Sequence, residues 1–417
     1  MAGHIQDRWY KTEPGPTGKP VRVKTDRHGV GLRYRARYVG PDGTEQSKSF
    51  PDRQKGHAEK WLLRIQADMD AGFLADPKAG EITFREYAEK WLGTLTTDLV
   101  SREVVRRRIR LHAVPYMGAR PMGSFKPEHA REWLGKLATA LPNATYRRSV
   151  YDSVSSLFNA AKDDGVIRAN PCHARSVKPP EPDPRLIQPW SEARVFAVRE
   201  GLPNRYKAVV DAGGGCGLRQ GEVFGLAEEN VDFATGWVHV RQQVKRVSGT
   251  LVFAPPKRGK LRSAPLSPIV GDRLRRHMDD VPPVSVALPW KTPDGPMVTR
   301  KLIFTSGVGK ALWRSYFDDH VWKRALAHAG VIPPKKPCGR YAAAPDDGMH
   351  ALRHFYASVL LDGGENIKAL SVYLGHSDPG FTLRIYTHLM PSSEERTRSA
   401  LSEVFQRGTP PVPALAA

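Results

Sequence analysis

The chain has 417 residues, 40% of them hydrophobic, which suits two to four domains with buried cores. Its net charge of +21 predicts a polyanionic partner such as nucleic acid, although composition alone fits an ordinary protein of high pI equally well. No apolar stretch reaches membrane-spanning length and the first ten residues are polar, so we expect a cytoplasmic protein without a membrane partner. The three cysteines lie far apart in sequence, which argues against a disulfide framework or a zinc site.

Residues 1–75 are predicted to form a small three-stranded sheet backed by one helix. Strands are indicated at 21–24, 31–39 and 45–50, and a helix with one apolar face follows at about 54–69. Apolar and basic residues alternate along the second strand, so its exposed face is basic and suits a DNA groove. Taken alone, the alternation slightly favours an ordinary solvated face. The basic residues concerned are Arg33, Arg35 and Arg37.

Residues 80–178 are predicted to be all-helical. A capping box at 83–86 begins one helix, Pro127 begins another, and Asn143 caps the clearest one. Residues 102–110 form a basic helix that can bind phosphates, although charge runs on helices are more often solvated faces. The candidate DNA contacts on this helix are Arg106, Arg107 and Arg110.

Residues 176–189 are rich in proline and charge, which predicts a stiff extended linker. The last segment, 186–417, is predicted to be mainly helical with a small sheet. Within it, the Pro-rich stretches 281–296 and 332–347 are predicted to be loops. The fold class is therefore multidomain α+β.

Six residues of this last segment are candidates for one phosphoryl-transfer site. Arg219 precedes a helix that bears Glu222, and its planar fork matches two phosphate oxygens. His350 and Arg353 stand at i and i+3 near a helix start, so they share one face. His354 competes with His350, but its position next to Arg353 favours a structural contact. The six are Arg219, Lys257, His350, Arg353, His376 and Tyr386.

The lysine is assigned from a predicted hairpin. Strands are indicated at 237–244 and 251–253, and Gly259 favours a hairpin tip over 257–261. Lys257 at such a tip is a mobile proton donor, whereas most hairpin lysines are merely solvated. Its rivals for the role are Arg258, Lys260 and Arg262.

His376 and Tyr386 are placed by two consecutive helices. The first is predicted at 366–374 and ends at Gly375, and the second begins near Pro379 and carries Tyr386. A tyrosine at helical spacing is more often a core residue than a catalytic one. Tyr386 is therefore a candidate because of the five residues that accompany it.

Four local contexts together resemble the tyrosine recombinase (phage integrase) family. The resemblance is strong from Arg219 to Tyr386 and looser upstream, where 1–75 looks like an arm-type DNA-binding domain and 80–178 like a core-site-binding domain. Residues 186–417 then correspond to the catalytic domain. The contexts are Gly-Leu-Arg-x-Gly-Glu at 217–222, His-x-Leu-Arg-His at 350–354, Leu-Gly-His-Ser at 374–377, and the final Tyr386.

The sequence departs from the family pattern at two points. Gly213 to Gly215 are more glycines than the family has there, and we expect them to loosen the packing behind Arg219. Arg258 stands where the family often has threonine after its lysine. The register of the predicted hairpin, and with it the choice of Lys257, therefore stays open.

The resemblance implies a site-specific DNA recombinase, an integrase that cleaves and rejoins DNA through a 3′-phosphotyrosine without metal or other cofactor. Such an enzyme integrates a mobile element and, with a partner factor, excises it. Tyr386 is then the nucleophile. Arg219, Arg353 and His376 bind phosphate oxygens, His350 takes the tyrosine proton or holds an oxygen, and Lys257 protonates the leaving 5′ oxygen.

The resemblance also implies partners. They are double-stranded attachment-site DNA, a homotetramer on that DNA, an excision (directionality) factor and a host DNA-bending protein, in the cytoplasm of a bacterial host. The tail with Glu394, Leu401 and Phe405 is expected to dock on a neighbouring subunit and gate Tyr386.

Three alternatives remain at this point. A Xer-like recombinase that resolves chromosomes or plasmids has the N-terminal sheet against it, and a type IB topoisomerase-like enzyme needs no such extra domain. A catalytically inactive DNA-binding protein has the complete set of six residues against it.

Overall fold

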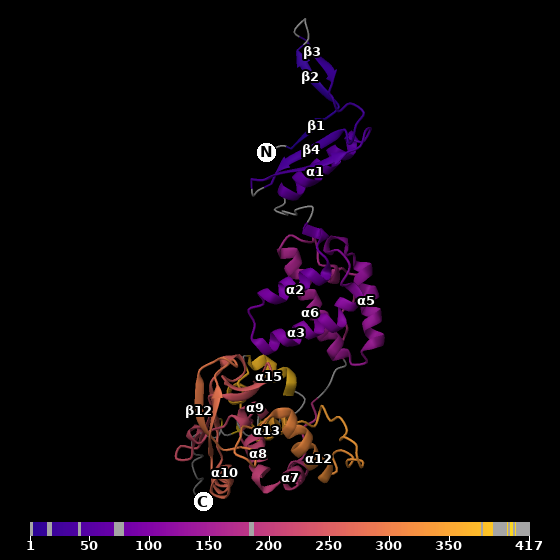
Figure 1. The fold of residues 1–417 in the computed structure, drawn as a ribbon. Helices are drawn as coiled ribbons and strands as arrows, with labels where there is room; N and C mark the ends of the chain where they lie inside the picture. Colours follow the sequence, from indigo (N-terminus) through magenta and orange to yellow (C-terminus); the bar gives the residue numbers. More distant parts are fainter. Residues whose placement is uncertain are drawn as a thin grey trace, which may run out of the picture. The chain divides into compact units, whose positions relative to one another are not determined.

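The computed structural model describes residues 3–14, 19–40, 43–70, 79–182, 187–376 and 378–386, together with 398, 401, 402 and 405. The chain divides into two compact units, Met1–Asp183 and Pro184–Ala417 (Figure 1). None of the helices within the described ranges is long and apolar enough to cross a membrane.

The N-terminal part of the first unit is a three-stranded antiparallel sheet with one helix packed on it. Its strand order is β1 (His4–Asp7), β4 (Tyr34–Val39) and β5 (Glu45–Phe50), and the helix is α1 (Lys55–Asp70). Tyr34, Ala36 and Tyr38 are buried and the residues between them are half-buried, which confirms the predicted alternation.

One strand of the predicted sheet was wrong. Residues 21–24 do form a strand, but this strand, β3 (Pro20–Lys24), pairs with β2 (Tyr10–Pro14) in a separate two-stranded ribbon. The third place in the sheet belongs to β1, whose sequence His-Ile-Gln-Asp has a single large apolar residue. So short and polar a strand gives almost no signal in the sequence pattern.

The rest of the first unit is helical and has its own core. The predicted capping box is present, since Thr83 Oγ1 accepts from the Glu86 amide and Glu86 accepts from the Thr83 amide. Asn143 caps its helix by accepting from the Tyr146 amide, also as predicted. The helices are α2 (Phe84–Thr94), α3 (Leu99–His112), α4 (Val114–Met117), α5 (Pro127–Ala140) and α6 (Ala144–Asp163), with 3₁₀ turns at Ala79–Glu81, Met122–Ser124 and Pro171–His173.

The predicted linker has neither helix nor strand over its described residues 177–182 and 187–189. In the predicted tail, Glu394 lies outside the described residues. Leu401 and Phe405 are described, and both are helical and exposed. The docking of this tail on a neighbouring subunit stays a prediction.

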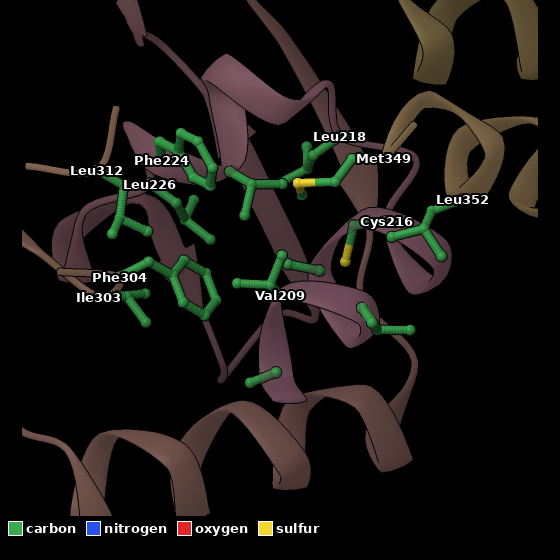
Figure 2. Close-up of a cluster of buried hydrophobic side chains, with 14 of the residues drawn as sticks. Val209, Cys216, Leu218, Phe224, Leu226, Ile303, Phe304, Leu312, Met349 and Leu352 are labelled. Atoms are coloured by element: carbon green, nitrogen blue, oxygen red, sulfur yellow. The ribbon is translucent and has the colours of Figure 1, made fainter. Parts of the chain in front are cut away.

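The second unit combines many helices with three small sheets around one large core. Figure 2 shows part of that core, where Cys216 lies beside Leu352. The sheets have the strand orders β10-β7-β6, β8-β9 and β11-β12. The strands are β6 (Val231–Asp232), β7 (Trp237–Val240), β8 (Gln243–Val247), β9 (Thr250–Ala254), β10 (Arg262–Pro265), β11 (Val284–Pro289) and β12 (Met297–Leu302).

The helices of this unit include those that carry the candidate residues. They are α7 (Glu192–Glu200), α8 (Asn204–Gly215), α9 (Gln220–Phe224), α10 (Pro268–Asp280), α11 (Arg314–Phe317), α12 (Lys323–His328), α13 (His350–Asp362), α14 (Ile367–Leu374) and α15 (Pro379–Tyr386), with a 3₁₀ turn at Glu228–Asn230 and a π-helical turn at Asp318–Trp322.

The two Pro-rich stretches of this unit behave differently. Residues 332–347 have no helix or strand, as predicted. Residues 281–296 are not simply a loop, because they contain β11, which forms a hairpin with β12. The prolines of this stretch lie before β11, at its last residue or in the turn that follows it, so none interrupts the strand interior.

Candidate active site

Arg219 is held at the start of α9 by a buried carboxylate. Its Nη1 donates to Glu222 Oε1 at 2.9 Å, and its backbone amide donates to Glu222 Oε2 at 2.8 Å. Arg262 of β10 donates to both oxygens of the same carboxylate, at 2.9 and 2.6 Å. Burial acts to raise the pKa of Glu222, but Arg262 and Arg219 outweigh it and hold the pKa at about 2. Glu222 is therefore ionised and orients Arg219.

The glycine run before Arg219 brings three helices close together. A Cβ atom on Gly213 would lie 2.9 Å from Leu352 of α13, and one on Gly215 would lie 2.7 Å from Val270 of α10. Gly217 has φ of +64°, and a Cβ there would lie 2.5 Å from the Tyr356 ring. The expectation that these glycines loosen the packing is wrong, because their missing side chains let α8 approach its neighbours.

Arg353 is almost fully buried, with 1% of its surface exposed. Its Nη1 donates to the Gly217 carbonyl at 2.7 Å, and its Nη2 donates to the Leu374 carbonyl. Arg219 Nη2 reaches the same Leu374 carbonyl at 3.4 Å. The two guanidinium groups therefore converge on one point at the end of α14.

His376 follows directly after Gly375 and joins this group. Its Nε2 lies 3.2 Å from Arg353 Nη2, and its Nδ1 lies 2.7 Å from Thr382 Oγ1 on α15. Burial, Arg353 and Arg219 lower the pKa of His376 to about 3, so the ring is neutral at pH 7. Because arginine has no acceptor atom, Nε2 accepts here and Nδ1 carries the proton.

Tyr386 lies at the end of α15 and points its hydroxyl at a histidine of α13. The phenol oxygen is 2.7 Å from His354 Nδ1, and Tyr386 is only 1% exposed. Burial raises the pKa of Tyr386 to about 12, although Arg353 and Arg219 act in the opposite direction. The sequence predicts a structural contact for His354 and gives no local sign of this bond, because Tyr386 lies 32 residues away.

His350 occupies a different position from the one that a tyrosine base requires. It is exposed, and its ring meets the His354 ring edge-on with the centroids 4.7 Å apart. Among the described residues, it makes no hydrogen bond with Tyr386. The i, i+4 spacing stacks the two histidines along one face of α13, with His354 nearer the phenol.

The predicted hairpin around Lys257 is absent. The preceding strand β9 pairs with β8, and the following strand β10 pairs with β7, so Lys257 lies on a 3₁₀ turn that connects two sheets. Lys257 is exposed and bonds no residue that the structure describes. Arg262, one of its rivals as proton donor, is fixed in the ion pair with Glu222 and is excluded from that role.

Positive charge exceeds negative charge at this site. Arg219 and Arg262 share the single carboxylate of Glu222, whereas Arg353 bonds only carbonyl oxygens and His376. Burial lowers the pKa of Arg353 to about 9, with Arg219 and Arg262 acting in the same direction, and a bound anion would offset the repulsion among the three cations. Within the described ranges, no cluster of His, Cys, Asp or Glu side chains suits a metal ion.

The arginines proposed for DNA contact in the first unit differ in how they are held. Arg33 is paired with Asp7 at 2.9 Å and Asp52 at 2.8 Å, Arg37 bonds Glu45, and Arg35 bonds Ser47. Arg110 is paired with Glu89 at 2.7 Å. Arg106 and Arg107 are exposed and bond no described residue. The Arg110 pair is exposed, and such pairs contribute little to stability, so a phosphate can replace Glu89 at little cost, whereas the Arg33 pairs are largely shielded from solvent.

Known proteins are similar to this chain in sequence and in fold. Residues 193–393 match the family model described as "Phage integrase family". The integrase of Mycobacterium phage D29 is 26% identical over 396 residues, covering 92% of this chain and 96% of that protein. At 92% coverage, that match also includes most of residues 1–185.

Solved structures share the fold. The Tn1549 transposon integrase in complex with transposon right end DNA has a TM-score of 0.62 at 19% identity and covers 77% of this chain and 99% of its own. A lambda integrase tetramer bound to a Holliday junction has a TM-score of 0.51 at 14% identity, covering 82% and 93%. The family model, the sequence relative and the shared fold agree with the motifs of the site, and residues 193–393 form a tyrosine recombinase domain of the phage integrase family.

Proposed function

We propose that this chain, a site-specific DNA recombinase of the integrase type, cleaves and rejoins DNA at Tyr386 and thereby integrates a mobile element. With a partner factor it also excises the element. The observation that carries the proposal is the convergence of Arg219, Arg353 and His376 on the end of α14, next to the helix that bears Tyr386. This arrangement supplies an anion site beside a nucleophile.

The proposed reaction is a transfer of the phosphoryl group from DNA to tyrosine. The Tyr386 oxygen attacks the scissile phosphorus, the bond to the 5′ oxygen breaks, and a 3′-phosphotyrosine link forms. The covalent link conserves the energy of the phosphodiester, so rejoining needs no ATP. Because Tyr386 is 1% exposed, residues that cover its hydroxyl must move before a phosphodiester reaches it.

The cations stabilise the charge that grows on the phosphate oxygens. Arg219 and Arg353 bind the non-bridging oxygens. His376 adds a hydrogen bond from Nε2 once its proton is on that atom, and in this tautomer Thr382 Oγ1 donates to Nδ1. Such preorganised donors contribute roughly 3–4 kcal/mol each to the transition state. His350, exposed on the same helix as Arg353, is available to hold a phosphate oxygen.

Lys257 is the proposed proton donor to the leaving 5′ oxygen. Its exposed position on a loop between two sheets leaves it free to enter the site when DNA binds. Lys260 on the same loop is exposed too and remains its rival.

Strand exchange requires two cleaved duplexes, so we propose a homotetramer on two attachment sites. The lambda integrase tetramer on a Holliday junction supports this assembly in a protein of the same fold. An excision factor and a host DNA-bending protein complete the proposed partners, in the cytoplasm of a bacterial host. The tail after Tyr386 would dock on the neighbouring subunit.

The upstream segments are proposed as two separate DNA-binding domains, 1–75 for arm-type sites and 80–178 for core sites, before a catalytic domain over 186–417. Separate hydrophobic cores in the first two segments support this division. Arg106 and Arg107 are the strongest candidate phosphate contacts, because they are exposed and bond no other described residue. Arg33, Arg35, Arg37 and Arg110 would exchange their present partners for phosphates.

The proposal is tested with attachment-site DNA and the variant Tyr386→Phe. The unaltered chain should form a covalent 3′ adduct and strand-exchange products, and Tyr386→Phe should form neither. Tyr316→Phe is the matched control, because Tyr316 is exposed and its ring lies at a tilt against His320. An adduct that survives Tyr386→Phe would reject the assignment, and relaxation of supercoils without site preference would favour a topoisomerase.

A further inference from the structure

The histidine that touches Tyr386 is not the one that the sequence favoured. His354 Nδ1 lies 2.7 Å from the Tyr386 hydroxyl, and the two ring centroids are 5.7 Å apart. This is a hydrogen bond of normal length to the reacting oxygen itself. His354 is half-buried on α13, immediately after Arg353, so one helix presents both the phosphate-binding guanidinium and the partner of the phenol.

The position of His350 strengthens this distinction. Its ring lies edge-on against the His354 ring at an interplanar angle of 83°, on the side of the helix start, and the residue is exposed. His350 therefore contacts the imidazole that contacts the phenol, rather than the phenol. A proton from Tyr386 has one direct acceptor among the described residues, and that acceptor is His354.

We propose that His354 is the catalytic base that accepts the Tyr386 proton during DNA cleavage. The inference rests on the proposed role of Tyr386 as nucleophile. As the bond between the Tyr386 oxygen and phosphorus forms, the phenol O–H bond breaks and its proton moves to His354 Nδ1. The 5′ oxygen leaves with a proton from the general acid, and on rejoining the His354 imidazolium returns its proton to the departing phenolate.

The charges around His354 make its ability to accept a proton depend on bound DNA. His354 is faced by His350 and Arg353 from its own helix and by Tyr386 from α15. Burial and Arg353 lower the pKa of His354 to about 4, so without DNA it is neutral and the phenol keeps its proton. A phosphate anion on Arg353 offsets that cation and raises the pKa of His354. The tyrosine is thus ionised only when a phosphate is there to be attacked.

The test compares two substitutions in the full chain by single-turnover cleavage of attachment-site DNA. His354→Asn keeps a hydrogen-bonding atom near the position of Nδ1 but removes the base. We expect it to cleave about 100-fold more slowly, because general bases contribute 10²–10⁴-fold. The cleavage rate of His354→Asn should still rise with pH in the range where the rate of the unaltered chain no longer changes. His350→Asn is the matched comparison, and any loss of rate in it should not depend on the ionisation of the Tyr386 phenol.

A second measurement separates a base from a merely structural histidine. Each variant is also made with 3,5-difluorotyrosine at position 386, whose phenol ionises at lower pH and needs less help from a base. This change should restore His354→Asn at least tenfold and leave His350→Asn unchanged. DNA binding and the unfolding temperature confirm that each variant is folded. If His354→Asn does not fold, the pH profile of cleavage is measured on the chain that keeps His354 and carries difluorotyrosine at position 386.

The outcomes are distinct. A His354→Asn rate within about threefold of the unaltered chain, or a slow rate that difluorotyrosine does not restore, overturns the proposal. A loss in His350→Asn that difluorotyrosine does restore assigns the base to His350 instead. If Tyr386→Phe abolishes the adduct while His354→Asn cleaves normally, this inference fails and the proposed function stands. If Tyr386→Phe still forms the adduct, the proposed function itself fails.

Discussion

Two parts of the site are built in opposite ways. The arginine cluster, which we define as Arg219, Arg262 and Arg353 with Glu222, is fixed by hydrogen bonds of 2.6–2.9 Å, and its carboxylate is fully buried. The Lys257 loop, residues 255–261, places its lysine in solvent and turns through left-handed backbone at Arg258 and Gly259, with φ of +64° and +69°.

The difference follows from what each part is proposed to do. Charge on the phosphate oxygens is best stabilised by dipoles and cations that need no rearrangement, so the arginine cluster is folded in advance. A proton donor must instead arrive at an oxygen whose position is set by the DNA. A lysine on an exposed loop meets that need, since its ammonium group is carried on a flexible stem.

The largest effect is expected from breaking the fixed part at Arg353. Arg353→Lys retains a positive charge but not the fork that reaches both Gly217 and Leu374, and we expect cleavage to fall about 100- to 1000-fold. Single-turnover cleavage measures the loss. Arg275→Lys, an exposed arginine of α10 paired with Asp272, is the control and should cleave normally. Equal rates for the two variants would mean that geometry at Arg353 is unimportant.

The second effect concerns the Lys257 loop. Lys257→Ala should slow cleavage of ordinary DNA about 100-fold, because the 5′ oxygen then leaves without a proton. A substrate with sulfur at the bridging 5′ position should be cleaved at nearly the original rate, since a thiolate leaves without protonation. Lys260→Ala is the matched variant on the same loop. Rescue by sulfur in Lys260→Ala, and not in Lys257→Ala, would move the role to Lys260.

The two parts also differ in how well the sequence predicted them. The motifs around Arg219, Arg353, His376 and Tyr386 predicted helix starts and ends that the structure confirms, because capping residues and glycines act locally. The Lys257 loop differs, because it joins two sheets where the sequence predicts a hairpin. Which strands pair depends on contacts between distant segments, and a glycine at a turn does not reveal them.

The contacts inside the arginine cluster cannot be predicted from the sequence, because they also join distant segments. Arg262 read as a rival proton donor, and only the approach of β10 to α9 shows that it is paired with Glu222, 40 residues away. The bond between His354 and Tyr386 spans 32 residues and depends on how α15 docks on α13. A local pattern identifies residue types and helix faces, but it does not say which of two histidines one turn apart meets the phenol.

The smallest expected effect tests whether the arginine cluster depends on close helix packing. An alanine at Gly215 would place its Cβ 2.7 Å from Val270 Cγ2, whereas one at Gly214 would make an ordinary 3.5 Å contact with Phe355. Overpacking of this kind destabilises by about 1–3 kcal/mol, while alanine in an unhindered helix position stabilises by roughly 0.5–1 kcal/mol. Gly215→Ala should therefore lower the unfolding midpoint in urea and Gly214→Ala should not. Because α8 leads directly to Arg219, Gly215→Ala should also slow cleavage severalfold. A destabilised Gly215→Ala that cleaves normally would show that Glu222 and Arg262 hold Arg219 in place without support from α8.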